Sequence, residues 1–481
     1  MRFLMFIHFL GKWMMLFNTV LLPSIVVSAL YRDGELAYFL LALLVNTAVG
    51  GGLWIAGGRH RLQLKLHDGF ILVVAMWLAT SLIACVHLVF SLGLGVTDAF
   101  FEAVSALTTT GATVITGLDG LPPSVLMFRQ ILQWLGGIGV VVSAVALLPM
   151  LGIGGMQMIK AEAPGPFKGE KLTPRIQHTA AALWKIYLVI TVACALAYWF
   201  AGMTAFDAIA HSFSTVSTGG FSTHDASFAY FDSAVIESLA IAFMLIGATS
   251  FAVHWMAWRR LSIEGYGQSD EVRAFVTIVA LVVVLVAAEL YAQGSRESMA
   301  QAFRASSFTV VSVITSTGFG VDNFSTWPAF LPMLLIMISF VGGCGGSTAG
   351  GMKVVRIVIL VKAIRLELFQ LVHPRAVKPL QLQGATVETR AVDGVMGFVS
   401  LYILIFAVLV LVMMGLGMDL ETAYGAVASC INNLGPGLGD VATDFQSASA
   451  ASKWILAFTM LLGRLEIFTF LVLFSPGFWK N

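Results

Sequence analysis

Charged residues are scarce in this sequence. Asp, Glu, Lys and Arg make up 11% of its 481 residues, whereas soluble globular proteins carry about 25%. So few charges cannot cover a water-facing surface, and apolar residues make up 58% of the chain. Most of the chain must therefore face lipid. The net charge of +1 lacks the basic excess of a nucleic-acid-binding protein, so no nucleic-acid partner is expected.

Cysteine clusters and hydrolase motifs are also missing. The four cysteines (Cys85, Cys194, Cys344 and Cys430) are far apart in apolar segments, which argues against a disulfide framework and a zinc site. No two histidines stand four residues apart, and neither a GxSxG motif nor a Walker-type loop is present. These absences argue against a membrane enzyme and give no sign of an organic cofactor.

Ten segments are apolar and long enough to span a bilayer, which takes about 20 residues. The N-terminal segment has no convincing cleavage site, so we interpret it as a retained helix. The connections 57–68, 160–175, 258–273 and 353–381 are basic and fall on one side, which predicts a multi-pass protein with both termini in the cytoplasm. The ten segments are 3–30, 36–55, 69–92, 124–151, 180–200, 234–258, 275–292, 329–360, 395–416 and 454–474.

The outward connections repeat one plan. Each has a short helix-compatible stretch, then a tract rich in Ser, Thr, Asn and Gly, then the next span. The first glycine of each tract is Gly111, Gly219, Gly318 or Gly435, at spacings of 108, 99 and 117 residues. We therefore expect an all-α membrane protein with four units of outer helix, half-helix, tract and inner helix around one pore. The expected divisions are 1–65 (two extra N-terminal helices), 66–165, 166–265, 266–375 and 376–481.

The four tracts have the composition of an ion filter. A half-helix of about ten residues reaches about 15 Å, half the hydrocarbon thickness, and irregular backbone at that depth must line protein or water. Four such units would bring backbone carbonyls face to face, as in filters of the TVGYG type. A plain turn between helices is the alternative for any single tract. The predicted potassium ligands are Thr109, Thr110, Gly111, Ser217, Thr218, Gly219, Ser316, Thr317, Gly318, Asn433, Leu434 and Gly435.

Several stretches together resemble one family. "SALTTTGATV", "HSFSTVSTGGFSTHDAS", "GGCGGSTAGGMKV", "NNLGPGLG" and "GRLEIFT" are similar to the membrane subunits of the Trk/Ktr/HKT potassium-transporter superfamily, most closely the TrkH type. The resemblance covers nearly the whole chain. It implies potassium uptake across the bacterial inner membrane, a homodimer, and regulation by a cytoplasmic nucleotide-binding subunit of the TrkA type.

The stretch "FVGGCGGSTAGGMK" (340–353) interrupts the eighth span with six glycines. Each glycine costs a helix about 1 kcal/mol relative to alanine, so the helix is expected to break there. The resemblance implies an intramembrane gating loop beneath the filter. The alternative is a helix-packing motif of GxxxG type. The gate residues are Gly342, Gly343, Gly345, Gly346, Gly350 and Gly351.

Arg464 is a charge within the last span. Charges at membrane depth usually face a cavity or a partner. We predict that Arg464 opposes cation passage at a constriction below the filter, as the resemblance supports. A structural salt bridge to another helix is the competing interpretation.

A secondary transporter of an organic solute is the second candidate function. Broken helices at an inverted repeat would predict two related halves and a midplane site. A fourfold repeat on one side of the membrane favours the ion pore instead. The residues fit both symport and passive potassium flow.

Overall fold

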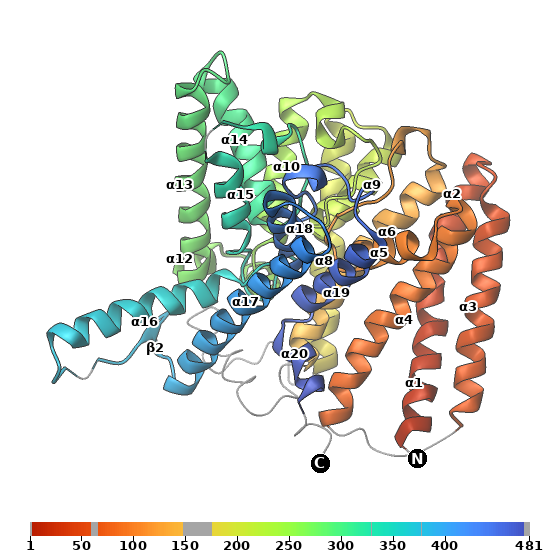
Figure 1. Ribbon diagram of the computed structural model, residues 1–481, viewed down its shortest axis with the longest axis horizontal. Coiled ribbons are helices and arrows are strands. Elements are labelled where there is room, and N and C mark those ends of the chain that lie inside the picture. The colour runs from red at the N-terminus through yellow and green to blue at the C-terminus, as the bar shows by residue number, and fades with distance from the viewer. Residues whose placement is uncertain (1, 59–65, 148–175, 329, 377, 476–481) are drawn as a thin grey trace.

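Helices form most of the described chain. The computed structural model describes residues 2–58, 66–147, 176–328, 330–376 and 378–475. The strands found in this part of the chain are β1 (Gln381–Leu382) and β2 (Ala385–Thr386), which pair in a small antiparallel hairpin. The fold is therefore helical, as expected, with one minor exception (Figure 1).

Four units follow one another, each with an outer helix and a shorter half-helix. The half-helices have 12, 12, 16 and 13 residues, so each is about 18–24 Å long and too short to cross the bilayer alone. The outer and half-helices are α4 (Leu66–Leu92) and α5 (Val96–Leu107), α8 (Ile176–Phe200) and α9 (Ala205–Val216), α13 (Asp270–Ala292) and α14 (Met299–Ile314), and α17 (Thr389–Gly415) and α18 (Leu420–Asn432).

Polar caps set the outer ends of three half-helices. The side chains of Thr204, Ser298 and Asp419 accept backbone N–H groups in the first turns of α9, α14 and α18. Such caps satisfy donors that have no partner within the helix. The sequence thus fixes where these three half-helices begin.

The inner helices differ from unit to unit. The first unit has a single helix and the other three have interrupted ones. The inner segments are α6 (Pro123–Leu147), α10 (Ala234–Gly247) with α11 (Phe251–Arg260), α15 (Leu331–Ser339) with α16 (Val354–Val372), and α19 (Ala450–Arg464) with α20 (Phe468–Leu471). Short connecting elements are η2 (Leu118–Gly120), η4 (Ser227–Phe231), α12 (Glu264–Gln268), η5 (Phe324–Thr326), η6 (Gly439–Val441) and η7 (Val472–Phe474).

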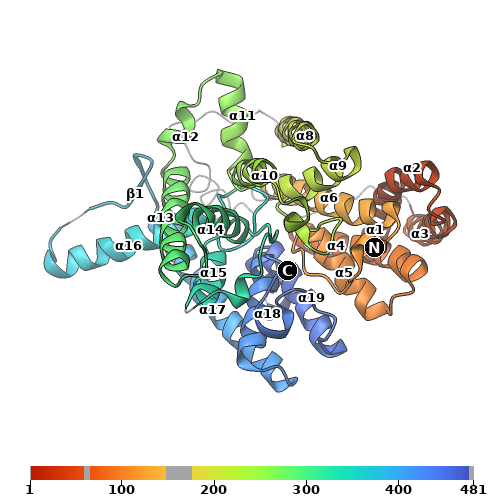
Figure 2. The same ribbon diagram turned by 90° about the horizontal axis from the view of Figure 1, so that it is seen from above.

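The units pack in a closed cycle. The inner helix of each unit contacts the half-helix of the next: α6 packs on α9, α10 on α14, α15 on α18, and α19 on α5. The last contact returns to the first unit. Figure 2 shows the four units in four sectors around a common centre.

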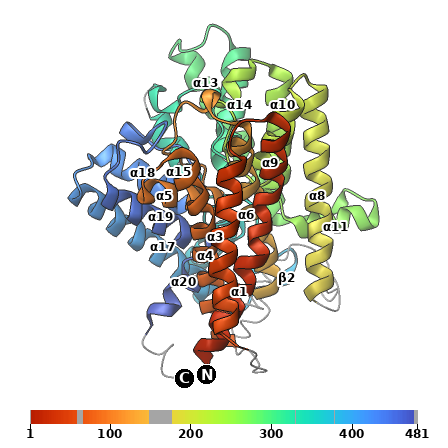
Figure 3. The same ribbon diagram turned by 90° about the vertical axis from the view of Figure 1, so that its right-hand side faces the viewer.

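The N-terminal helices stand outside this cycle. α1 (Arg2–Phe17) packs on α3 (Leu36–Ala56) and α4, while α2 (Leu21–Tyr31), which follows η1 (Asn18–Val20), packs on α6. Figure 3 shows these helices along one flank of the molecule. The start of α1 and the segment α20 lie at the same end of the molecule (Figures 1 and 3).

The spans agree in part with the ten that were expected. Six described helices are long and apolar enough to cross a membrane, or eight if two bent pairs each count as one span. The bends are 96° between α10 and α11 and 110° at the break after Arg464, where the sequence predicted continuous spans. Of the other two expected spans, 124–151 is described as α6 to residue 147, and 329–360 is divided by residues 340–353. The basic segments 59–65 and 160–175 lie outside the described residues.

Candidate functional site

The four half-helices end in the same way. A serine in the last turn accepts, through its backbone carbonyl, the N–H of the residue five positions later. The sequence carries a serine at this spacing before each tract. The pairs are Ser105–Thr110, Ser214–Gly219, Ser312–Thr317 and Ser429–Leu434, at 2.9, 2.7, 2.8 and 2.8 Å.

Backbone angles confirm this alignment. One residue of each tract is left-handed, at φ of 52–53°, namely Thr109, Thr218, Ser316 and Asn433. A glycine with positive φ follows two positions later: Gly111 (81°), Gly220 (80°), Gly318 (79°) and Gly435 (104°).

The predicted register of the second tract is therefore wrong by one residue. Thr218-Gly219-Gly220 corresponds to Thr109-Thr110-Gly111, whereas the sequence had suggested Ser217-Thr218-Gly219. The physical reason is that Ser217 still caps the C-terminus of α9, as Thr108 caps α5. The first glycine of this tract, Gly219, is not the left-handed one.

The four left-handed glycines close a ring of backbone carbonyls. Each lies against the carbonyl of the preceding tract position in the next unit, so a side chain there would overlap that oxygen. Only glycine combines this close approach with a positive φ at low cost. An added Cβ would meet the oxygen of Gly219 from Gly111, of Thr317 from Gly220, of Leu434 from Gly318, and of Thr110 from Gly435.

Two asparagines tie the fourth tract to its neighbours. Asn432 donates to the Ser339 hydroxyl at 2.8 Å and accepts from the Tyr402 hydroxyl at 2.5 Å. Asn433 donates to Thr110 Oγ1 at 2.9 Å and to the Met460 carbonyl at 3.0 Å. The polar "NN" pair thus links units three, four and one through buried hydrogen bonds.

A buried ion pair supports the first tract from behind, and sequence reasoning missed it. Arg129 Nη2 lies 2.7 Å from Glu102 Oε1, and both side chains are almost wholly buried. The other carboxylate oxygen accepts the Val114 N–H at 3.0 Å, and the guanidinium lies 4.1 Å from the centre of the Phe221 ring. The i and i+27 spacing gave no local signal, because the residues lie on different helices.

Residues 340–353 form a non-helical loop against the inner ends of three tracts. The Gly350 N–H donates to Ser316 Oγ at 2.5 Å. Thr348 Oγ1 donates to the Val216 carbonyl at 3.0 Å and accepts from Thr218 Oγ1 at 3.2 Å. Gly350 also lies directly on the Asn432 carbonyl. The loop therefore contacts tracts two, three and four at once.

The helix-packing alternative for this loop is wrong. A GxxxG motif works when its glycines share one helix face. Gly342 and Gly346 are instead left-handed, both at φ of 70°, and Gly342 packs on Gly350 and Gly351 within the loop. The six glycines break the span, as their helix propensity predicted.

Glu271 holds the loop from the outer helix α13, another residue that the sequence did not reveal. One carboxylate oxygen accepts the N–H of Gly345 at 2.6 Å and that of Val355 at 3.1 Å. Val355 lies in the first turn of α16, where N–H groups lack helical partners and a negative charge is favourable. A single buried carboxylate thus fixes the loop and the start of the following helix.

Arg464 contacts the same loop. Its Nη1 donates to the Thr348 carbonyl at 2.8 Å, and its Nη2 donates to the Gly136 carbonyl at 3.4 Å. Arg464 is buried, and within the described residues no carboxylate lies within ion-pair distance of it. The salt bridge to another helix, which was the competing interpretation of Arg464, is therefore absent from this part of the chain.

Glu466 contacts the helix that follows the loop. It lies 2.7 Å from Arg356 of α16, and the Arg356 guanidinium also lies 4.2 Å from the Phe398 ring centre. Arg464 and Glu466 both lie at the break in the last inner helix. Arg464 contacts the loop, and Glu466 contacts α16, the helix that follows the loop.

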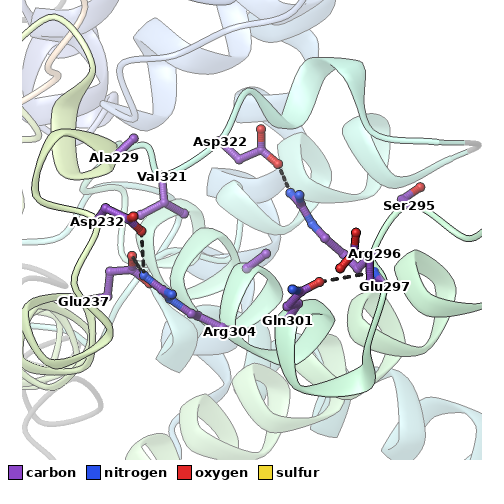
Figure 4. A pocket seen from close by; sticks show the side chains of 11 residues that line it. Ala229, Asp232, Glu237, Ser295, Arg296, Glu297, Gln301, Arg304, Val321 and Asp322 are labelled. Atoms are coloured by element: carbon purple, nitrogen blue, oxygen red, sulfur yellow. Dashed lines mark hydrogen bonds and ion pairs between the residues drawn. The ribbon is translucent and has the colours of Figure 1, made fainter.

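The outer acids are partly paired with arginines. Arg304 lies 2.7 Å from Glu237 and 3.5 Å from Asp232, and Arg296 bonds Asp322 just beyond the third tract. These groups line a cavity of about 480 Å³ between units two and three (Figure 4). The negative charges of Asp232 and Asp322 are thus partly neutralised by neighbouring arginines.

A histidine joins the outer ends of units one and two. His224 Nδ1 lies 2.5 Å from Asp119 Oδ1, and this hydrogen bond holds the pKa of Asp119 below its usual value. The Asp225 carboxylate accepts the Gly117 N–H at 3.0 Å in the reverse direction. These contacts connect the two segments that follow tracts one and two.

The fold and the site define a class: a helical multi-pass membrane protein in which four short helices end at a ring of backbone carbonyls. The TrkH family profile, described as a cation transport protein, matches residues 36–480. The chain is 48% identical to the Trk system potassium uptake protein TrkH of Vibrio parahaemolyticus, with all of both chains covered. It is 46% identical to the protein of the same name from Halomonas elongata, with 99% of each covered.

A solved structure of a relative has the same fold. The crystal structure of the potassium transporter TrkH from Vibrio parahaemolyticus matches with a TM-score of 0.92 and 46% identity over the whole of both chains. The chain belongs to the TrkH family of cation transport proteins. This membership confirms the family resemblance and the prediction of a transport protein that is not an enzyme.

Proposed function

We propose that this protein takes up potassium through a gated, channel-like pore. The observation that carries the proposal is the closed ring formed by the carbonyls of Thr110, Gly219, Thr317 and Leu434. Carbonyl oxygens replace the water shell of a potassium ion in known filters. The relatives named as potassium uptake proteins support the choice of ion.

The four half-helices add to this preference for a cation. Each ends at its tract, so the partial negative charge of each helix C-terminus is directed toward the ring. In the register of the structure, the proposed ligands come from Thr109 to Gly111, Thr218 to Gly220, Ser316 to Gly318, and Asn433 to Gly435.

The loop at 340–353 is proposed as the gate. It contacts the inner ends of three tracts, and Arg464 bonds its Thr348 carbonyl. A positive charge beside the ion path raises the energy of a passing cation. Opening would require the Arg464 bond and the Glu271 bonds to loosen, because both hold the loop in its present position.

The assembly is proposed to be a homodimer regulated by a cytoplasmic subunit of the TrkA type, in the bacterial inner membrane with both termini in the cytoplasm. α16 extends away from the four units in Figure 1. It exposes Ile364, Leu368 and Leu371, an apolar face of the kind that a second copy buries. Because α16 begins where the loop ends, a partner bound to α16 would act directly on the gate.

Ion flux in liposomes tests the proposal. Purified protein is reconstituted with potassium inside, and efflux is compared for potassium, sodium and an uncharged solute at a clamped potential. We expect potassium flux well above sodium flux and no solute flux. Solute flux without ion selectivity would favour the organic-solute transporter instead, and a requirement for a sodium or proton gradient would indicate symport.

A further inference from the structure

The second tract lacks the side chain that braces the first, third and fourth. In the first tract the hydroxyl of Thr110 lies 2.7 Å from that of Thr108, and in the third Thr317 makes the same bond with Thr315, also at 2.7 Å. In the fourth tract Leu434 is fully buried in the core. The equivalent residue of the second tract is Gly219, which has no side chain.

Gly219 is also followed by Gly220, so this tract has two successive glycines at the ring. Glycine has more backbone freedom than any other residue. Without support, the Gly219 carbonyl would be the least fixed of the four. Potassium selectivity requires carbonyls held at spacings that a smaller ion cannot bridge as well.

Gln133 of α6 occupies the space beside Gly219. An added Cβ on Gly219 would lie 2.5 Å from Gln133 Cδ. Gln133 Nε2 donates to the Gly219 carbonyl at 2.5 Å, and Gln133 Oε1 accepts the Phe221 N–H at 3.1 Å. The carboxamide is fully buried. Its two hydrogen bonds engage the residues on either side of Gly220, as a neighbouring β-strand would.

We propose that Gln133 is the positioning residue that gives the second tract its ion selectivity, in place of the missing side chain. The inference rests on the proposed filter. A carbonyl oxygen has two lone pairs, so the Gly219 oxygen can accept from Gln133 and still face an ion. The brace comes from the preceding unit, because α6 packs on α9.

The test is the potassium-to-sodium flux ratio of Gln133→Met, a substitution of similar volume without hydrogen bonds. We expect the ratio to fall at least tenfold while potassium flux stays within a few-fold of wild type. Trp134→Phe is the matched control. It removes one part-buried hydrogen bond from the next residue of α6, to Thr191 at 3.0 Å, and should keep the wild-type ratio.

A rescue variant separates positioning from general packing. In Gln133→Ala the space beside Gly219 is vacated, and Gly219→Ala added to it restricts the backbone there. The double variant should regain part of the lost selectivity, whereas independent packing defects would add. If Gln133→Met aggregates, Gln133→Glu gives the ratio, because it keeps the acceptor for Phe221 and loses the donor to Gly219.

Two outcomes would overturn the inference. A folded Gln133→Met or Gln133→Glu protein with the wild-type ratio refutes it, and so does a Gly219→Ala addition that only worsens selectivity. Gly220→Ala is measured in parallel. If Gly220→Ala alters the ratio while Gln133→Met does not, the filter stands and this inference fails. If neither alters it, the filter itself is refuted.

Discussion

Replacement of Arg464 tests how the proposed gate is held closed. The guanidinium donates to the Thr348 carbonyl of the loop at 2.8 Å and to the Gly136 carbonyl of α6 at 3.4 Å. Removing it therefore has two consequences: a positive charge disappears from the proposed ion path, and the loop loses a bond that holds it under the tracts. Both should raise the basal potassium flux.

The two effects differ in size. At an effective dielectric constant of 20, two unit charges 4 Å apart repel by about 4 kcal/mol, which lowers ion occupancy by roughly three orders of magnitude. A hydrogen bond from a charged group contributes about 1.5–3 kcal/mol, or roughly 10- to 100-fold in the population of a displaced loop. We therefore expect Arg464→Ala to raise flux at least tenfold without a regulatory subunit.

Arg464→Lys separates the charge from the anchor. Lysine keeps the positive charge, but its donors are all on a single nitrogen and cannot reach two carbonyls as the planar guanidinium does. Flux near that of wild type would indicate that charge dominates, and flux near that of Arg464→Ala would indicate that the anchor to Thr348 dominates. Arg464→Met serves as a neutral variant of similar length.

The assay is potassium flux in liposomes at a clamped potential, with size-exclusion profiles of every variant. A monodisperse Arg464→Ala or Arg464→Met protein with unchanged flux would refute the barrier role. Aggregation of both neutral variants together with a well-folded lysine variant would show instead that the charge is needed for folding.

Three further predictions concern the tracts, the loop and the buried ion pair. Gly318→Ala should weaken potassium–sodium discrimination, because a side chain at this φ of 79° meets the Leu434 carbonyl. Gly320→Ala is the control, since its Cβ would lie 3.8 Å from the nearest atom. Equal potassium-to-sodium flux ratios in the two variants would contradict the ring. Partial deletion of 342–351 should raise basal potassium flux, and a folded deletion variant that conducts no better than wild type would count against a gate. Glu102→Gln should cost about 3–5 kcal/mol by leaving the Arg129 charge buried and unpaired, seen as a lower thermal aggregation temperature; an unchanged temperature would show that the pair is not needed for stability.

The sequence by itself determined the class of protein and its repeated plan. The scarcity of charge required a membrane environment, and the spacing of Gly111, Gly219, Gly318 and Gly435 revealed units of about a hundred residues. The glycines at 342–351 were enough to predict a broken span. These inferences hold because helix length, helix breaking and lipid exposure depend on composition within one segment.

Tertiary structure decided the register and the partners. The tract with two adjacent glycines has two possible alignments in the sequence. The left-handed angles of Thr218 and Gly220 select one of them. The sequence also marked Arg464 as unusual without indicating that it bonds the loop 116 residues away.

The supports behind the site left no local trace for the same reason. Gln133 reaches Gly219 from another unit, 86 residues away, and Glu271 reaches Gly345 across 74 residues. A buried polar side chain needs a partner, but which backbone group supplies it depends on how the helices pack. The closed cycle of four units is what brings these side chains and the tracts together.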